Sequence, residues 1–321
     1  MHSVLISLAA AALVAQSIGA MAQSWPAKPI RVIVPFGAGS AVDVIPRIVL
    51  DEAARSIGQS IVVEPRPGAG GTTGAAMVAK AEPDGYTLLI NSSAHTIVPW
   101  VYSNLSFDPI KDLVGVATIG NLPNVLVTAP SNGFKTVADL VAAAKAKPGT
   151  FNMGSAGVGT ATHISADLFR LSAGFEAAHV PFKSGAEAMT ETIAGRIQYY
   201  FSPSGTAVPL IREGRLSGLV VSTPKRSAAL PDVPTTLEAG YPNSDYTFWV
   251  ALFAPSKTPR AAIERMHQEI VKAQQVASVK DRLSQNGVEP LSLTPAELDA
   301  QVAREIAANQ AVVKALGLKA N

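Results

Sequence analysis

The chain has 321 residues, 48% of them hydrophobic, and its 26 Lys and Arg against 24 Asp and Glu give a formal net charge of +2. This composition predicts a globular protein long enough for two domains, and because no basic tract occurs we expect no nucleic-acid partner. The chain has no cysteine, which excludes disulfides, thiolate metal sites and a cysteine nucleophile. Its five histidines never have the spacing of a metal site, so we expect no metal, and we expect no cofactor.

The N-terminal residues have the pattern of an export signal. Residues 4–15 form an apolar run that is too short to span a bilayer but suits a signal peptide. Ala20-Met21-Ala22 then provides a cleavage pattern, although Met1-His2-Ser3 lacks the usual positive charge. A short buried helix is the alternative reading, but it would have no polar face. We therefore expect a signal peptide over residues 1–22 and a periplasmic mature protein.

The first strand leads into the stretch on which the functional interpretation depends. Residues 30–34 form a β-branched apolar run, typical of a buried parallel strand, and Gly37-Ala38-Gly39-Ser40 follows as a loop of small residues. A helix comes next, and we place its start by Pro46, because proline is tolerated in the first helical turn. The unpaired N–H groups of such a helix start suit a carboxylate or phosphate. We therefore expect the protein to bind a small organic anion.

Strands and helices alternate through most of the chain. The βαβαβ order at the start predicts a doubly wound sheet with its ligand beyond the carboxyl ends of the strands. Further strands are expected over residues 61–63, 86–90, 114–119, 125–129, 150–153, 179–182, 196–201, 216–222 and 250–255. Further helices are expected over about 73–81, 136–147, 163–169, 185–193, 208–212, 259–276, 279–285 and 295–316, with Thr136 and Thr294 as N-caps.

The strand, glycine-rich loop and helix of the first fifty residues recur later in the chain. Residues 154–160, Gly-Ser-Ala-Gly-Val-Gly-Thr, follow a short strand and precede a helix. Because only helices remain after the strand at 250–255, they should pack back on the first lobe. The chain would then cross between the lobes near residues 122–128 and again near 246–253.

An ordered set of motifs, covering essentially the whole mature chain, resembles the tripartite tricarboxylate transporter receptors, also called the Bug or TctC family. No single motif is specific, but the set is. The motifs are Lys28–Phe36 with Ala38-Gly39 and Asp43, Arg66–Gly71, Pro83–Leu89, Phe107–Asp112, Ala144–Gly149 and Leu230–Thr235.

The resemblance implies an α/β type II periplasmic binding protein fold. Two lobes, each a mostly parallel sheet flanked by helices, would be joined by two crossing strands. We expect residues 23–124 plus 250–321 to form lobe 1 and residues 125–249 to form lobe 2. The resemblance also implies a solute receptor, expected to be a monomer, which captures a small carboxylate and delivers it to the membrane permease of a tripartite tricarboxylate transporter.

The same resemblance implies the site. The loops at residues 36–40 and 155–160 would grip the ligand carboxylate, Ser92 and Ser93 would close one wall, and the segment after residues 198–201 would close another. The expected ligand-binding residues are Phe36, Ala38, Gly39, Ser40, Asp43, Ser92, Ser93, Ser155, Gly157, Gly159, Thr160, Phe182, Ser202 and Ser204. Aromatic candidates for an apolar lining, whose strand spacing equally suits a core, are Phe36, Phe182, Tyr199, Tyr200, Phe201 and Trp249.

The sequence departs from the family pattern at two of these positions. Many relatives have Gly-Gly where this chain has Gly39-Ser40, so Ser40 adds a hydroxyl donor or narrows the pocket. Several relatives carry an aspartate, suited to an ammonium group, where this chain has Ser202. We therefore expect a ligand without an ammonium group, either a dicarboxylate or an aromatic carboxylate.

An exported α/β hydrolase or dinucleotide-dependent enzyme is the alternative. Asp43 suits a loop-fixing cap as well as a ligand contact, and His163 suits a structural hydrogen bond as well as a general base. Ser155 lacks the GxSxG context of a nucleophile. Glu64 lies where a dinucleotide fold places its ribose acid, but the loop lacks the third glycine and Pro35 interrupts it. Because no nucleophile, base and oxyanion set can be assembled, we expect a binding protein and not an enzyme.

Overall fold

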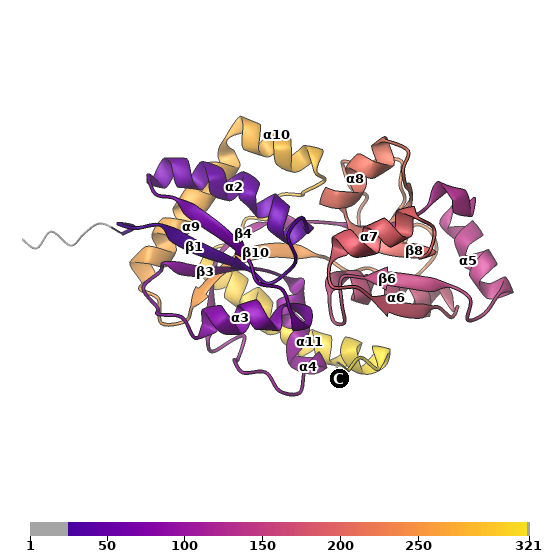
Figure 1. The fold of residues 1–321 in the computed structure, drawn as a ribbon, viewed down its shortest axis with the longest axis horizontal. Helices are drawn as coiled ribbons and strands as arrows, with labels where there is room; N and C mark the ends of the chain where they lie inside the picture. The colour runs from indigo at the N-terminus through magenta and orange to yellow at the C-terminus, as the bar shows by residue number, and fades with distance from the viewer. Residues whose placement is uncertain (1–24, 320–321) are drawn as a thin grey trace, which may run out of the picture.

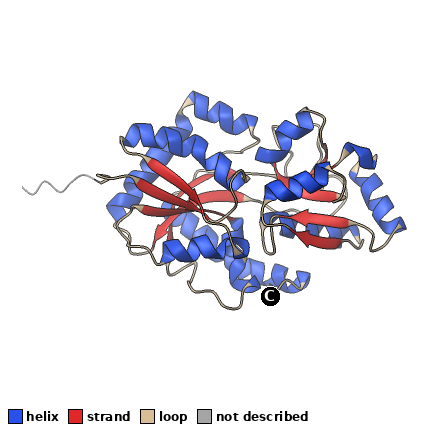
Figure 2. Ribbon diagram, in the orientation of Figure 1, coloured by secondary structure: helices blue, strands red, loops and turns tan. Residues whose placement is uncertain are grey.

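The computed structural model describes residues 25–319, so the expected signal peptide over residues 1–22 lies outside the described residues. The described chain forms two α/β lobes side by side, each built on one five-stranded sheet (Figures 1 and 2). No helix within residues 25–319 has both the length and the apolar character needed to cross a membrane.

The first sheet has the order β2-β1-β3-β10-β4. Strands β1 and β2 pair in parallel, as do β1 and β3, whereas β10 runs antiparallel to both of its neighbours, β3 and β4. Its strands are β1 (Ile30–Val34), β2 (Ile61–Pro65), β3 (Thr87–Ser92), β4 (Leu113–Asn121) and β10 (Trp249–Pro255).

The second sheet repeats this plan in the order β7-β6-β8-β5-β9, with β5 as the reversed strand. Its strands are β5 (Asn124–Thr128), β6 (Asn152–Ser155), β7 (Ala178–Pro181), β8 (Tyr199–Pro203) and β9 (Ser217–Val221). In each sheet all strands but one point the same way. The reversed strand of each sheet, β5 or β10, lies next to one of the two connections between the lobes.

Helices cover both faces of the first sheet. One apolar core lies between the sheet and α2, α9 and α10, and a second lies between the sheet and α3 and α11. The helices of this lobe are α2 (Ala41–Ile57), α3 (Thr72–Ala79), α4 (Val98–Val101), α9 (Arg260–Gln275), α10 (Ala277–Gln285) and α11 (Pro295–Leu316), with short 3₁₀ turns at Ala69–Gly71 and Ser93–Thr96.

The second lobe has the same layered arrangement. One core lies between the sheet and α5 and α6, and the other between the sheet and α7 and α8. These helices are α5 (Val137–Ala146), α6 (Ala161–Ala173), α7 (Gly185–Ile193) and α8 (Ser204–Arg212), and a 3₁₀ turn spans Pro130–Asn132.

Two of the predicted helix starts are confirmed by their N-cap residues, and one predicted start is wrong. Thr136 and Thr294 each close a capping box, as their spacing to Asp139 and Glu297 predicts. The start placed by Pro46 is wrong, because α2 begins at Ala41 and Pro46 lies inside it. The Ser40 carbonyl already accepts the N–H groups of residues 43 and 44, each at 2.9 Å, so the helix is established before the proline.

The two connections between the lobes run side by side. The chain passes from β4 to β5 through residues 122–123 and returns from β9 to β10 through residues 222–248. The Leu122 N–H donates to the Phe248 carbonyl at 2.7 Å, and the Ser222 N–H donates to the Asn124 carbonyl at 2.8 Å. Each connection therefore supports the other, as expected for two crossing strands.

A third link between the lobes is made by side chains. The C-terminal part of α11 extends toward α6 of the second lobe (Figure 1). One apolar cluster contains Ile97 and Val101 at the two ends of α4, Ile164 of α6, Val313 of α11, and Leu318 just after α11. We call this set the interlobe cluster.

Candidate functional site

A cavity of about 220 Å³, here called the inner cavity, lies between the lobes. The N-terminal turns of α2 from the first lobe and of α6 and α7 from the second all contribute to its wall, together with the start of α8. Its lining residues are Phe36, Gly37, Gly39, Ser40, Ala41, Val42, Ser92, Ala156, Thr160, Ala161, Thr162, Ser184, Gly185, Ala186, Met189, Tyr200, Pro203, Thr206 and Phe248.

These helix starts supply hydrogen-bond donors to the inner cavity. The N–H groups in the first turn of an α-helix have no acceptor within the helix. Ala41-Val42, Ala161-Thr162 and Gly185-Ala186 are the first two residues of α2, α6 and α7, and all of them line the cavity. The positive ends of three helix dipoles therefore meet at one cavity, which favours a bound anion.

No charged side chain lines the inner cavity within the described residues. Its polar side chains are hydroxyl groups, among them Ser92, Thr160, Thr162 and Thr206. The Ser40 Oγ is buried and has no hydrogen-bond partner in the protein. A buried hydroxyl without a partner is costly, so it is a natural donor to a ligand at this position.

A second, more open cavity of about 800 Å³, the outer cavity, adjoins the first. The two cavities share Phe36, Gly37, Ala156 and Ser184, so together they form one cleft. A β-carbon added to Gly37 would lie only 3.1 Å from the Ser184 Cβ, which shows how closely the lobes approach there. The other outer residues are Pro35, Ala38, Pro67–Gly71, Tyr102, Gly157, Val158, Phe182, Lys183, Glu187 and Lys319.

The first loop, residues 36–40, is held by an ion pair. The Gly39 N–H donates to the Asp43 Oδ2 at 2.9 Å. The other carboxylate oxygen of Asp43 accepts hydrogen bonds from the Arg47 Nε at 3.0 Å and Nη2 at 2.7 Å. Both carboxylate oxygens of Asp43 therefore take part in fixing the loop.

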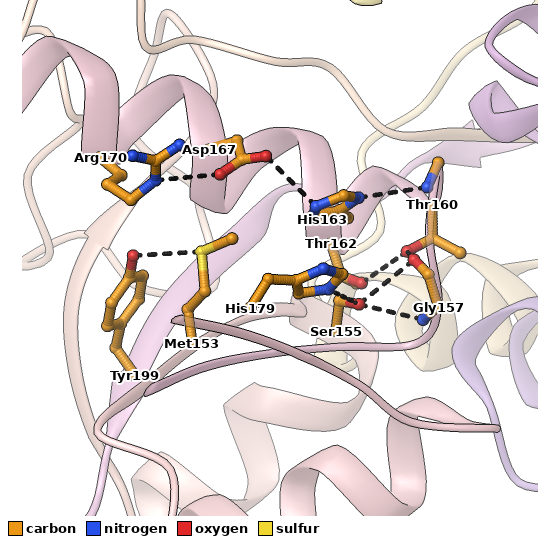
Figure 3. A network of polar contacts seen from close by, with 11 residues as sticks. Met153, Ser155, Gly157, Thr160, Thr162, His163, Asp167, Arg170, His179 and Tyr199 are labelled. Carbon is orange, nitrogen blue, oxygen red and sulfur yellow. Dashed lines mark hydrogen bonds and ion pairs between the residues drawn. The ribbon is translucent and has the colours of Figure 1, made fainter. Parts of the chain in front are cut away.

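The second loop, residues 155–160, is held from beneath by two histidines (Figure 3). The Gly159 N–H donates to the His163 Nδ1 at 3.2 Å. The Gly157 N–H donates to the Ser155 Oγ at 3.1 Å, and that oxygen lies 2.6 Å from the His179 Nε2. The two imidazole rings are stacked, with their centroids 3.7 Å apart.

Burial controls the charge of this network. It lowers the pKa of His179 from 6.5 to about 4, helped by the neighbouring His163 and opposed by Asp167. Burial by itself would raise the pKa of Asp167, but hydrogen bonds and charge from His163 and Arg170 outweigh it, so that this pKa is lowered. At neutral pH His179 is therefore uncharged and Asp167 is an anion.

The structure brings part of the expected site together. Phe36, Gly39, Ser40, Ser92 and Thr160 line the inner cavity. Phe36, Ala38, Gly157 and Phe182 line the outer cavity.

Other expected residues contact the loops or the lobe interior and line neither cavity. Asp43, Ser155 and Gly159 are occupied in the loop contacts described above. The Ser93 Oγ is buried and has no partner.

Ser202 and Ser204, expected to form the wall after β8, are buried and line neither cavity. The Ser202 Oγ lies 2.9 Å from the Thr206 Oγ1, and it is Thr206 that lines the inner cavity. The Ser204 Oγ donates to the Gly287 carbonyl at 2.9 Å, a contact with the first lobe. Ser202 lines neither cavity, so it does not by itself decide whether an ammonium group can bind.

The sequence did not single out several lining residues. Ser184 is the N-cap of α7, the helix predicted over residues 185–193, and its pattern Ser-x-x-Glu, ending at Glu187, is the signal that could have marked this helix start as a further part of the site. Thr162 and Thr206 lie one or two residues into their helices, and Phe248 comes from a connection with no motif.

The aromatic candidates divide between the cleft and the cores. Tyr200 lines the inner cavity, and Phe36 and Phe182 lie at the cleft as described above. Tyr199, Phe201 and Trp249 are buried in the lobe cores.

The residues considered for an enzyme have structural partners. Ser155 lies beside His179, but it lines neither cavity, and Asp167 pairs with His163 rather than with His179. Glu64 pairs with Arg31 at 2.9 Å and with Arg66 at 3.1 Å. Within residues 25–319 no group of three or more His, Asp or Glu side chains is placed to hold a metal ion.

The sequence and structure were compared with known proteins. Residues 45–318 match the family described as the tripartite tricarboxylate transporter family receptor. A protein encoded in the tcbD–tcbE intergenic region of Pseudomonas sp. (strain P51) is 36% identical over 273 residues, which are 85% of this chain and 81% of the relative.

Two solved structures are similar along nearly the whole chain. An R. palustris protein solved with adipate is 30% identical with a TM-score of 0.89, covering 92% of this chain and 100% of its own. MatC from Rhodopseudomonas palustris, with bound malate, is 29% identical with a TM-score of 0.84, covering 90% of this chain and 100% of its own. These similarities confirm the expected two-lobed α/β fold.

Proposed function

Because the chain belongs to the tripartite tricarboxylate transporter receptor family, whose members are periplasmic solute receptors, we propose that it captures a small organic carboxylate in the cleft and delivers it to the membrane permease of such a transporter. The proposal includes that the mature protein acts as a monomer and releases its ligand chemically unchanged. The adipate and malate named for two similar structures are small dicarboxylates, which supports this class of ligand.

The inner cavity carries the proposal. First-turn N–H groups of α2, α6 and α7 converge on it from both lobes, and no charged side chain lines it. A carboxylate bound there would be held by dipoles and hydroxyl groups. Each hydrogen bond to the charged group contributes about 2 kcal/mol, roughly twice the contribution of a neutral one.

The lining also supports a ligand without an ammonium group. An ammonium ion needs a carboxylate or several carbonyl acceptors, and no Asp or Glu side chain lines the inner cavity. Among the described residues, the acidic side chain that lines the outer cavity is Glu187, which accepts the Lys183 N–H at 3.1 Å. Apolar walls from Phe36, Tyr200 and Phe248 favour an aliphatic chain or an aromatic ring beside the carboxylate.

Calorimetry on matched pairs of ligands tests the proposal. The mature protein would be titrated with succinate and aspartate, then with adipate and 2-aminoadipate, and with benzoate. We expect saturable binding by at least one acid that lacks an amino group, and at least tenfold weaker binding, about 1.4 kcal/mol, by its amino counterpart.

Tight binding of aspartate with no response to plain acids would contradict the ligand class. A proton NMR spectrum of the ligand after incubation checks the rest, because the proposal requires that the acid be recovered intact. Conversion to a product would instead favour the enzyme alternative.

A further inference from the structure

His163 makes two contacts that fix the position of its proton. Its Nδ1 faces the Gly159 N–H at 3.2 Å, and its Nε2 lies 3.2 Å from the Asp167 Oδ2 (Figure 3). A backbone N–H can only donate, and a carboxylate can only accept. Nδ1 must therefore be unprotonated, and Nε2 must carry the hydrogen.

Asp167 is itself held in place. The Arg170 Nε donates to its other carboxylate oxygen at 3.1 Å, so the Asp167 Oδ2 stays aimed at His163. Both partner side chains are buried, His163 at 4% and Asp167 at 5% exposure. The series of contacts from Arg170 through Asp167 to His163 therefore ends in the His163 Nδ1, an acceptor directed at the second loop.

Two basic side chains lie close to the imidazole. His179 of β7 stacks on the ring at 3.7 Å, and Arg170 supplies a positive charge from α6. A proton on Nδ1 would also point at the Gly159 N–H, donor against donor. Asp167 accepts the Nε2 hydrogen on the other side of the ring.

This contact lies directly behind ligand-facing atoms. Gly159 and His163 are four residues apart, and the turn between them contains Thr160, Ala161 and Thr162, all of which line the inner cavity. Gly159 has a φ of +77°, a conformation that other residues rarely adopt, so this turn depends on being held in one shape.

We infer that His163 is a positioning residue for carboxylate capture: its unprotonated Nδ1 holds the Gly159 amide and thereby aims the first turn of α6 at the ligand. The inference rests on the proposed function for its ligand. It assigns His163 no direct ligand contact, and it requires the neutral imidazole with hydrogen on Nε2.

Two substitutions separate positioning from simple structural support. His163→Leu removes the acceptor, whereas His163→Asn keeps an oxygen near the place of Nδ1. We expect His163→Leu to raise the Kd at least tenfold and His163→Asn to stay within about threefold of wild type. Calorimetry with whichever of adipate, malate and benzoate binds wild type best gives the Kd, and thermal melting confirms that each variant is folded.

A Kd of His163→Leu equal to that of the wild type would overturn the inference. If His163→Leu does not fold, His163→Gln replaces it, because its longer amide reaches toward Asp167 and leaves Gly159 unbound. Affinity in the glutamine variant equal to that of His163→Asn would also overturn the inference.

A measurement without ligand keeps the inference separate from the proposed function. The nitrogen chemical shifts of the ¹⁵N-labelled His163 ring, recorded near pH 7, report which nitrogen carries hydrogen. We expect the Nε2–H form in wild type and a mixture of forms in Asp167→Asn. An Nδ1–H form or an imidazolium in wild type would overturn the inference even if a carboxylate binds. If no carboxylate binds while the Nε2–H form is seen, the proposed function fails and the positioning role for a carboxylate fails with it.

Discussion

The two loops of the cleft are built on the same spacing with different chemistry. In the first lobe the Gly39 amide is held by Asp43, which pairs with Arg47. In the second lobe the Gly159 amide is held by His163, which pairs with Asp167. In both lobes the glycine, the acceptor of its N–H and the partner of that acceptor are spaced four residues apart. The acceptor is the third residue of its helix, α2 or α6.

The difference lies in charge and burial. The first loop uses a buried carboxylate that pairs with Arg47, whose side chain remains 39% exposed, so the charged partner of this lock reaches solvent. The second uses a neutral imidazole that is almost wholly buried. A charged lock tolerates water, whereas a neutral buried lock depends on hydrogen-bond direction and on the absence of an added proton. The same geometry, a glycine N–H bonded to the third residue of the following helix, is therefore held by a carboxylate in one lobe and by an imidazole in the other.

The largest predicted effect is a loss of folding stability at acidic pH, caused by His179 behind the second loop. Because the native pKa of His179 is about 4 and its ordinary value is 6.5, the unfolded chain binds more protons between these pH values. Stability therefore falls as the pH is lowered through this window. We expect a loss of about 2 to 3 kcal/mol from His179, measured as the free energy of unfolding in urea at pH 7 and pH 4.

His179→Gln is the control for this prediction. Buried His95, with its pKa also lowered to about 4, contributes a similar pH dependence in both proteins. The substitution should therefore remove only part of the acid sensitivity. An unchanged pH dependence in His179→Gln would show that the histidine network is not the acid-sensitive element.

The next effect breaks the first loop's lock. Asp43→Ala removes both the acceptor for the Gly39 amide and the partner of Arg47, and we expect a loss of about 2 kcal/mol in the free energy of unfolding at pH 7. Asp51→Ala, an exposed change on the same helix α2, is the matched control and should cost much less. Equal losses in the two variants would mean that the ion pair does not fix the loop.

The smallest effect concerns the unpartnered hydroxyl of the first loop. Ser40→Ala should leave the unfolding free energy unchanged and weaken carboxylate binding about tenfold, because one hydrogen bond to the charged group is lost. Ser204→Ala is the counterpart in the second lobe, since its hydroxyl bonds the Gly287 carbonyl outside the cavity. It should lower stability with no change in Kd. A Ser40→Ala variant that binds like wild type would place the carboxylate elsewhere in the cleft.

Local patterns predicted the elements well. The β-branched run of β1, the caps Thr136 and Thr294, and the recurrence of a glycine-rich loop before α6 all depend on residues close together in sequence. The start of α2 was misplaced because the prediction used Pro46, a residue type that is usual in a first helical turn. The hydrogen bonds that the Ser40 carbonyl accepts show that the helix begins earlier.

The site was predicted less completely, for a physical reason. The loops were found because their small residues are adjacent, but which atoms face the cleft depends on partners distant in sequence. The Ser155 side chain is buried beside His179 of the neighbouring strand β7, whose Nε2 lies 2.6 Å from the Ser155 Oγ. Ser184 and Phe248 reach the cavity only through the packing of α7 and of the second connection between the lobes.

The interlobe cluster has a consequence for motion. Helix α11 packs on the first sheet, yet Val313 near its C-terminal end belongs to one apolar cluster with Ile164 of α6. Any swing about the paired backbone connections that parts α11 from α6 wets these side chains, at about 25 cal/mol for each Å² uncovered. A conformation with separated lobes would therefore expose an apolar surface that is buried in this structure.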